Sequence, residues 1–146
     1  MTTSLYDRDI SLWVEDTVAK LKARDFANLD LENLIQETES LGKQQKQELR
    51  NRLGILIGHL LKWDYQPELR SKSWKATIRE QRDELYEILD DNPSLKPYLA
   101  EALQKGFQKG INLVLKETPL DLPDLPQALP YTIAQILDRD FPSGIN

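Results

Sequence analysis

Cysteine is absent from this sequence of 146 residues, and histidine occurs once, at position 59. Without cysteine, the chain can form no disulfide bond, no catalytic thiolate and no sulfur-bound metal site. A single histidine excludes metal sites that need several imidazoles, and it leaves an acid–base relay without a second imidazole. The lack of disulfides is typical of a reducing compartment, so we expect a cytoplasmic location.

The signatures of common enzyme classes are also missing. The sequence contains no phosphate-binding loop and none of the motifs GxGxxG, GxSxG and HExxH. Because no complete catalytic constellation is visible, we favour a protein that is not an enzyme, with no cofactor and no bound metal.

No stretch of the chain is apolar for long enough to cross a membrane. The longest nearly unbroken apolar run is LGILIGHLL, residues 53–61, about half of the ~20 residues that a spanning helix needs. The first ten residues, MTTSLYDRDI, carry acids where a signal peptide has a basic region and an apolar core. We expect a soluble intracellular protein without a membrane partner.

Apolar residues recur at helical spacing along the chain, and no alternating strand pattern of useful length appears. The spacing predicts helices over about 7–22, 30–42, 43–66, 71–92, 95–115 and 131–137. Before the last of these, the stretch TPLDLPDLPQALP interleaves four prolines with four leucines, which predicts an extended strap over the core. We therefore predict an all-α fold: a single domain over residues 1–146, a bundle of about five to six helices with a Pro-rich strap before a short C-terminal helix.

Two pairs of glycines fall inside predicted helices. Gly54 and Gly58 lie on one side of the helix over 43–66, so a neighbouring helix can approach closely there. Gly106 and Gly110 each cost their helix about 1 kcal/mol relative to alanine, unless close packing requires them.

The segment RSKSWKATIREQR, residues 70–82, is basic although the whole chain has a net charge of -5. Five basic residues and one acid give it a local charge of +4. Its cations at 72, 75, 79 and 82 fall within about 80° of one another on a helix, and the first two stand at the helix start, where the dipole disfavours cations. A cation-lined helix start predicts an anion site. The candidate anion- or partner-binding residues are Arg70, Ser71, Lys72, Ser73, Lys75, Arg79 and Arg82.

The anion that faces this basic stripe could be the protein's own. The predicted helix over 30–42 carries four acids and no basic residue before Lys43, and packing it against the stripe would satisfy both. Otherwise the stripe binds an anionic ligand or another protein, or it is a solvated surface without a ligand. Nucleic acid is a further alternative, less favoured because the chain is acidic overall.

His59 defines a second candidate, a polar cluster with Glu37 and Glu39 that would form if the second and third predicted helices folded back on each other. As the one side chain that titrates unaided near neutrality, it could serve a small hydrolase or phosphotransfer enzyme as a general base. Otherwise it is a core residue bonded to a carboxylate or carbonyl. Trp63 and Trp74 lie on apolar stripes and are expected in the core, although aromatics among cations could also stack on bases.

The segments DLENLIQETESL, HLLKWDYQP, RSKSWKATIREQR, NPSLKPYL and YTIAQILDRDF, in this order, closely resemble the bacterial family catalogued as domain of unknown function twenty-nine. The resemblance covers essentially the whole chain, and it implies an all-helical single domain with no established activity. The positions that match its signature are Glu37, Glu39, His59, Lys62, Trp63, Gln66, Pro67, Arg70, Ser73, Trp74, Ile78 and Arg79. Our leading hypothesis is a non-enzymatic helical binding or interaction module with an anion-accepting cleft at the start of the fourth helix.

Overall fold

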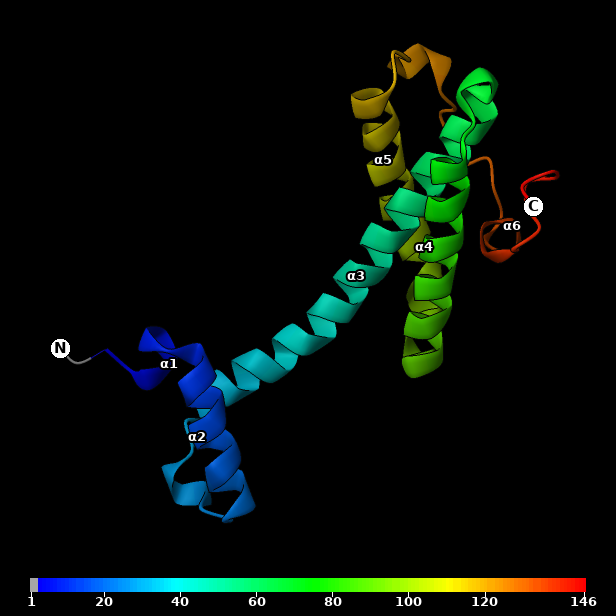
Figure 1. Cartoon of the computed structure of the whole chain (residues 1–146). Helices are drawn as coiled ribbons and strands as arrows, with labels where there is room; N and C mark the ends of the chain where they lie inside the picture. Colours follow the sequence, from blue (N-terminus) through cyan, green and yellow to red (C-terminus); the bar gives the residue numbers. More distant parts are fainter. Residues whose placement is uncertain (1–2) are drawn as a thin grey trace. The chain divides into compact units, whose positions relative to one another are not determined.

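The computed structural model describes residues 3–146, and within them the chain is all-α, as predicted (Figure 1). It has six α-helices and no strand among these residues. The α-helices are α1 (Leu5–Arg8), α2 (Ile10–Lys22), α3 (Leu31–Tyr65), α4 (Lys72–Asp91), α5 (Leu99–Glu117) and α6 (Ile133–Leu137). Short 3-10 helices cover Phe26–Asn28, Pro67–Leu69, Pro93–Tyr98 and Leu122–Asp124.

The described residues group into two compact units, one up to Lys43 and one over Gln44–Asn146. A single domain over residues 1–146 stays a prediction, and the first two residues of that range and of the MTTSLYDRDI segment lie outside the described part. We describe each unit by itself.

The N-terminal unit contains α1, α2 and the first turns of α3. The sequence predicted one helix from residue 7, but Asp9 interrupts it with an extended backbone (φ -155°, ψ 93°). The Asp9 carboxylate accepts the Leu12 N–H at 3.1 Å and caps α2, so Asp9 and not Asp7 begins this helix. Trp13 is buried, and its ring meets Tyr6 edge-on at 5.0 Å.

α3 runs without interruption from Leu31 to Tyr65, so the predicted helix end at Gly42 is wrong. A glycine ends a helix by adopting a left-handed conformation, and among the glycines of residues 3–146 only Gly144 has a positive φ. Gly42 is followed by lysine and glutamine residues that favour helix, and one interior glycine costs only about 1 kcal/mol. The helix therefore continues through it.

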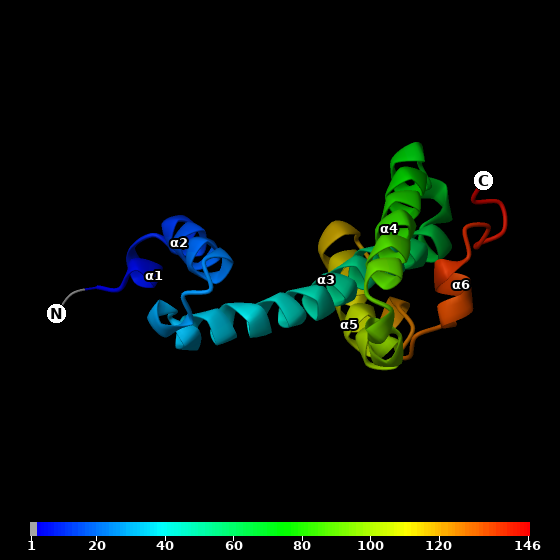
Figure 2. The same ribbon diagram turned by 90° about the horizontal axis from the view of Figure 1, so that it is seen from below.

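The C-terminal unit has its core where α4 and α5 flank the second half of α3 (Figure 1 and Figure 2). Leu53, Leu56 and Leu60 of α3 have no more than 1% of their surface exposed. α4 contributes Ile78 and Leu85, and the other buried residues of the core include Phe107, Val114, Leu125, Tyr131 and Ile136. Trp63 is buried in this core, as predicted, and Trp74 is partly buried at the edge of the core, against which it packs.

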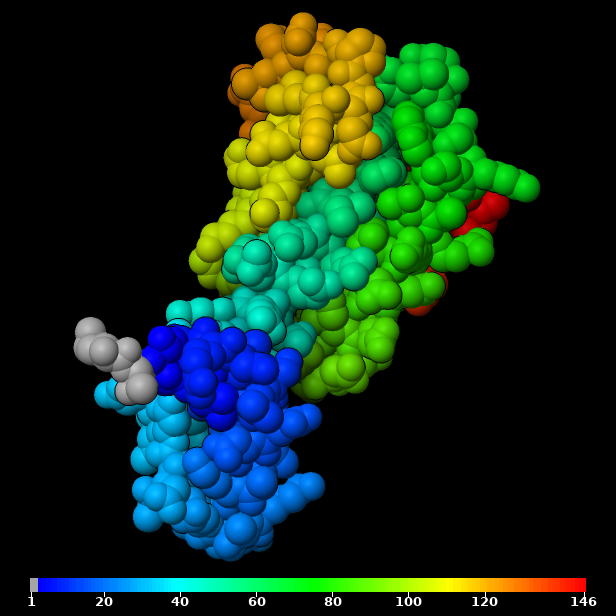
Figure 3. All heavy atoms as spheres, turned by 60° about the vertical axis from the view of Figure 1, so that its left-hand side comes forward, coloured from blue at the N-terminus to red at the C-terminus, as the bar shows by residue number. Residues whose placement is uncertain are grey.

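The glycines of α3 and α5 face one another where these two helices pack together. A Cβ atom built on Gly54 would lie 2.7 Å from the Cβ of Lys109, and one on Gly110 would lie 3.0 Å from the backbone nitrogen of Gly58. Figure 3 shows the atoms of α5 (yellow) lying directly against those of the second half of α3 (teal). The predicted close neighbour of Gly54 and Gly58 is therefore confirmed, and the same contact explains Gly106 and Gly110.

The Pro-rich strap packs on this core through three of its four leucines. Leu125 is buried and Leu120 and Leu129 are partly buried against the core, whereas Leu122 is 62% exposed. The strap ends later than predicted, because α6 begins at Ile133 and not at residue 131. Thr132 and Gln135 cap each other's backbone N–H groups at that point. The fifth predicted helix also starts late, since Pro97 has no N–H and the residues before α5 form a 3-10 helix.

Candidate functional site

A pocket of about 480 Å³ lies between α4 and the segment that follows α6. Four of the side chains that line it are cations and one is a carboxylate. The lining residues are Lys75, Ile78, Arg79, Arg82, Arg139, Asp140, Ile145 and Asn146. The pocket is therefore basic, with one apolar wall from Ile78 and Ile145.

Three of the seven predicted site residues, Lys75, Arg79 and Arg82, line this pocket. Arg139 joins them from a segment 57 residues beyond Arg82. No local signal marked Arg139, because only the packing of the C-terminal segment on α4 brings its guanidinium to the basic stripe. The other four predicted residues do not line the pocket.

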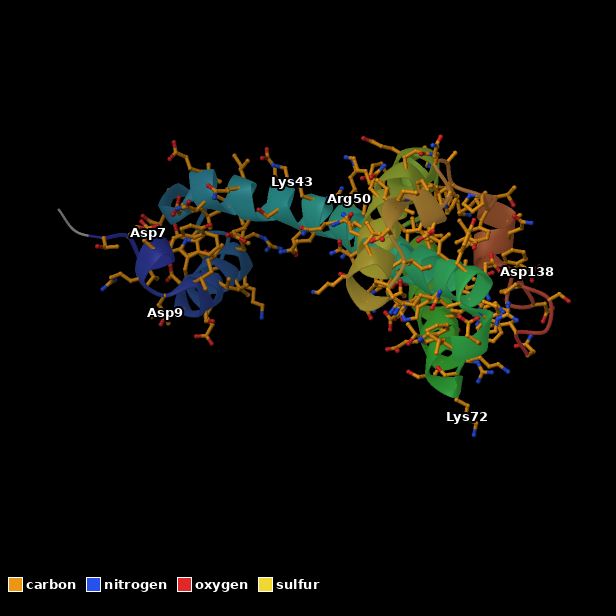
Figure 4. The ribbon with its side chains drawn as sticks, turned by 90° about the horizontal axis from the view of Figure 1, so that it is seen from above. Asp7, Asp9, Lys43, Arg50, Lys72 and Asp138 are labelled. Atoms are coloured by element: carbon orange, nitrogen blue, oxygen red, sulfur yellow. The ribbon has the colours of Figure 1, made fainter. Side chains whose placement is uncertain are left out.

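Arg70 and Ser71 make local structural contacts instead. The Arg70 Nε–H donates to the carbonyl of Trp63 at 2.8 Å, and the guanidinium stacks on the Trp63 ring at 4.7 Å. The Ser71 hydroxyl accepts the Trp74 N–H at 3.2 Å and thereby caps α4. Lys72 and Ser73 are exposed, and Lys72 points away from the other helices of this unit (Figure 4).

Arg82 is the one basic residue of the stripe that is fully buried, with 1% of its surface exposed. Its Nε–H donates to the carbonyl of Ile136 at 2.8 Å, and a terminal N–H donates to the carbonyl of Gln135 at 3.3 Å. These carbonyls belong to the last turn of α6, at the negative end of the helix dipole. The Gln135 carbonyl also accepts the backbone N–H of Asp138 at 3.2 Å. Burial lowers the pKa of the Arg82 guanidinium, and the charge of Asp138 opposes this shift. The partners of Arg82 are thus backbone carbonyls at a helix end within the protein.

The remaining cations of the pocket differ in their partners. The Arg139 guanidinium pairs with Asp83 and stacks on the Tyr86 ring at 4.8 Å. Lys75 and Arg79 are exposed, and within residues 44–146 no carboxylate lies within 4.0 Å of their side-chain nitrogen atoms. The carboxylate of Asp140 accepts a hydrogen bond from the Asn146 amide at 2.8 Å. Lys75 and Arg79 are therefore the cations of this pocket that an anion could engage.

The second predicted site, the polar cluster of Glu37, Glu39 and His59, stays a prediction. Glu37 belongs to the N-terminal unit, where it accepts a hydrogen bond from the Tyr6 hydroxyl that raises the pKa of Tyr6. His59 belongs to the C-terminal unit, where its Nδ1–H donates to the carbonyl of Ile55 at 2.9 Å. Burial lowers the pKa of His59. The helix end at Gly42 on which the fold-back rested is not present in α3.

Lys62 is a buried polar residue that matches the family signature but was not among the predicted site residues. Its side chain is 5% exposed, and Nζ donates to the Glu117 carboxylate at 3.1 Å and lies 5.5 Å from the centre of the Trp74 ring. The ion pair of Lys62 with Glu117 could not be predicted from the sequence, because it depends on α5 packing beside α3.

Residues 3–146 contain no group of three or more histidine, aspartate or glutamate side chains placed to hold a metal ion. None of the helices in this part of the chain combines the length and the apolar character that crossing a membrane requires.

Comparison with known proteins gives a single result. The family model described as "Domain of unknown function DUF29" matches residues 5–142, which confirms the resemblance seen in the sequence. No curated protein and no solved structure matches the chain.

Proposed function

We propose that this chain, which belongs to the family described as "Domain of unknown function DUF29", is a non-enzymatic module that binds a small organic anion in the pocket between α4 and the C-terminal segment. The observation that carries the proposal is the pair Lys75 and Arg79, two exposed cations that line a basic pocket and have no ion pair within residues 44–146.

The position of Lys75 supports an anionic ligand. Lys75 lies in the first turn of α4, where the positive end of the helix dipole disfavours a cation by about 0.3–1 kcal/mol. Arg79 stands one turn further along the same face, and Arg82 and Arg139 add positive charge behind them. A bound anion would relieve this repulsion, while the single carboxylate of the pocket, that of Asp140, offsets only part of it.

The size and walls of the pocket indicate the kind of anion. Small-molecule pockets usually measure about 300–1,000 Å³, and this one measures about 480 Å³. A guanidinium binds phosphate or carboxylate through two parallel N–H groups, which suits Arg79 as the principal contact. The apolar wall of Ile78 and Ile145 suits a carbon skeleton, so the ligand class is a small organic phosphate or carboxylate.

The proposal differs from the sequence-based hypothesis in the place of the site. The sequence pointed to the very start of the fourth helix, with Arg70 and Lys72 among its cations. The proposed site lies over the first two turns of α4, at Lys75 and Arg79, and Lys72 is not part of it. Lys72 therefore offers a matched control on the same helix.

Isothermal titration calorimetry of the full chain with inorganic pyrophosphate and with citrate tests the proposal. We expect one of the two probes to bind with a dissociation constant below about 1 mM, and the choice between them separates phosphate from carboxylate. Lys75→Ala and Arg79→Ala should each weaken that binding at least about 10-fold, because a hydrogen bond to a charged group contributes about 1.5–3 kcal/mol. Lys72→Ala should change it less than about 2-fold, since exposed charges outside a site contribute little.

Two results would contradict the proposal. One is no heat of binding with either probe at millimolar concentration, with unchanged helical circular dichroism. The other is an equal loss in all three variants, together with binding of duplex DNA that weakens steeply with salt. That second result would favour a nucleic-acid interface along the exposed face of α4, because phosphate contacts release counterions and do not depend on one pocket.

A further inference from the structure

The wall that the C-terminal segment gives to the anion pocket carries one acid, Asp140. Four cations line the same pocket, yet within residues 44–146 no side-chain nitrogen of a lysine or arginine lies within 4.0 Å of the Asp140 carboxylate. The Asn146 amide donates to Oδ1 of Asp140 at 2.8 Å, and no donor of residues 44–146 is bonded to Oδ2. Asp140 therefore keeps one carboxylate oxygen available to a ligand.

Packing holds Asp140 in the pocket wall. On its C-terminal side the Phe141 ring packs against the core and meets Tyr131 edge-on at 5.7 Å, and Ile145 is only 5% exposed. On its N-terminal side the Asp140 N–H donates to the Asp138 carboxylate at 2.9 Å. The place of this carboxylate thus depends on its neighbours in the chain and not on an ion pair.

The charged groups of the pocket that lack a partner indicate the charges of the ligand. Arg82 and Arg139 already have partners inside the protein. Lys75 and Arg79 remain as two cations and Asp140 remains as one anion. A ligand that complements them has about two negative charges in one group and one positive charge in another. A phosphate monoester carries about −1.5 to −2 charges at pH 7, and an ammonium group supplies the positive charge.

Other charged groups complement the pocket less well. A phosphodiester, as in a nucleic acid or a lipid headgroup, has a single negative charge for the two cations. A divalent metal ion as the positive group would need more oxygen ligands than one carboxylate provides, and residues 3–146 offer no group of three acids for it. An ammonium group needs only acceptors such as Oδ2 of Asp140. The apolar wall of Ile78 and Ile145 suits a short carbon chain between the two charged groups.

We infer that the pocket selects an aminoalkyl phosphate, a phosphate monoester with an ammonium group at the other end of a short carbon chain. The phosphate binds Lys75 and Arg79, and the ammonium group donates to Oδ2 of Asp140. The inference rests on the proposed function and deepens it, because it names the ligand class and makes Asp140 the residue that determines specificity. A phosphate with an apolar end would leave the Asp140 carboxylate without a partner, so it binds less tightly.

Isothermal titration calorimetry of the full chain with two pairs of isosteric phosphates tests the inference. The pairs are 2-aminoethyl phosphate with propyl phosphate, and 3-aminopropyl phosphate with butyl phosphate, in which a methyl group replaces the ammonium group. In at least one pair the amino compound should bind at least about 5-fold more tightly, as a charged hydrogen bond at a partly exposed site allows. Glycerophosphoethanolamine, a diester with the same ammonium group, should bind at least about 3-fold more weakly than 2-aminoethyl phosphate.

The variant Asp140→Asn separates the ammonium contact from the phosphate contact. It should reduce the preference for the amino compound to about 2-fold or less and bind the alkyl phosphate at least as tightly as the natural chain does. Lys75→Ala and Arg79→Ala should weaken both members of a pair alike. The matched control is Asp90→Asn, which removes the same charge from an exposed acid of α4 outside the pocket and should leave the preference unchanged.

The possible failures can be told apart. Equal binding within both pairs, or a preference that survives Asp140→Asn, would overturn this inference and leave the proposed function standing, provided that an alkyl phosphate, pyrophosphate or citrate binds. Equally tight binding of the diester would overturn the assignment to a phosphate monoester. If neither the phosphates nor citrate binds while the helical circular dichroism is unchanged, the proposed function and this inference both fail.

Discussion

Gly54 and Gly42 lie on the same helix, α3, and the structure predicts opposite effects when each is replaced by alanine. A Cβ on Gly54 would lie 2.7 Å from the Cβ of Lys109, 3.4 Å from its Cδ and 3.5 Å from the carbonyl oxygen of Gly106. A Cβ on Gly42 would meet nothing within 4 Å. Because the Cβ of Lys109 is attached directly to its backbone, it can give way only if α5 moves.

The expected magnitudes follow from two opposing effects. Alanine gains about 1 kcal/mol over glycine in a helix interior at either position. At Gly54 the overpacking costs about 3 kcal/mol, the upper end of the usual range, since carbon atoms normally approach to only about 3.5–4.0 Å. Gly54→Ala should therefore lower the free energy of unfolding by about 2 kcal/mol, and Gly42→Ala should raise it by about 1 kcal/mol.

Urea denaturation followed by far-ultraviolet circular dichroism measures both effects, and thermal unfolding provides a second reading. For a chain of this length we expect the midpoint to fall by about 4–8 °C in Gly54→Ala and to rise by about 2–4 °C in Gly42→Ala. If Gly54→Ala were as stable as Gly42→Ala, the close approach of α3 and α5 would be refuted.

Two further predictions concern buried charged and titratable groups. Arg82→Ala should lower the free energy of unfolding by about 3 kcal/mol and speed amide hydrogen exchange in α6, because the Ile136 carbonyl loses its donor, the Gln135 carbonyl keeps only the Asp138 N–H, and a cavity forms. A loss below about 1 kcal/mol in urea denaturation would contradict this account. His59 has its pKa lowered by burial from the ordinary value of 6.5, so the unfolded chain binds a proton that the folded chain resists, and stability should fall as the pH drops below 6.5. This fall should be smaller in His59→Gln between pH 7 and pH 5, and identical slopes in the two proteins would show that His59 is not its source.

In the candidate site, residue spacing predicted which cations share a helix face, but not the environment of each one. The cations Lys75, Arg79 and Arg82 could be placed on one face of a helix from their sequence separation alone, since helix geometry is the same in every protein. Their different environments could not be predicted. Arg82 is buried because α6 ends beside it, and Arg139 reaches the pocket only because the C-terminal segment packs on α4.

The sequence by itself determined the all-α class, the glycine pairs that admit a close helix and the positions of most helices, because these depend on local propensity and periodicity. The continuation of α3 through Gly42 is also local in origin, since the cost of one glycine is smaller than the combined preference of its neighbours for helix. Only the tertiary structure decided which side of each apolar stripe is buried. The residues of α3 from Leu49 to Trp63 have α4 and α5 to pack against, whereas Leu31 and Ile35, equally apolar in sequence, are exposed.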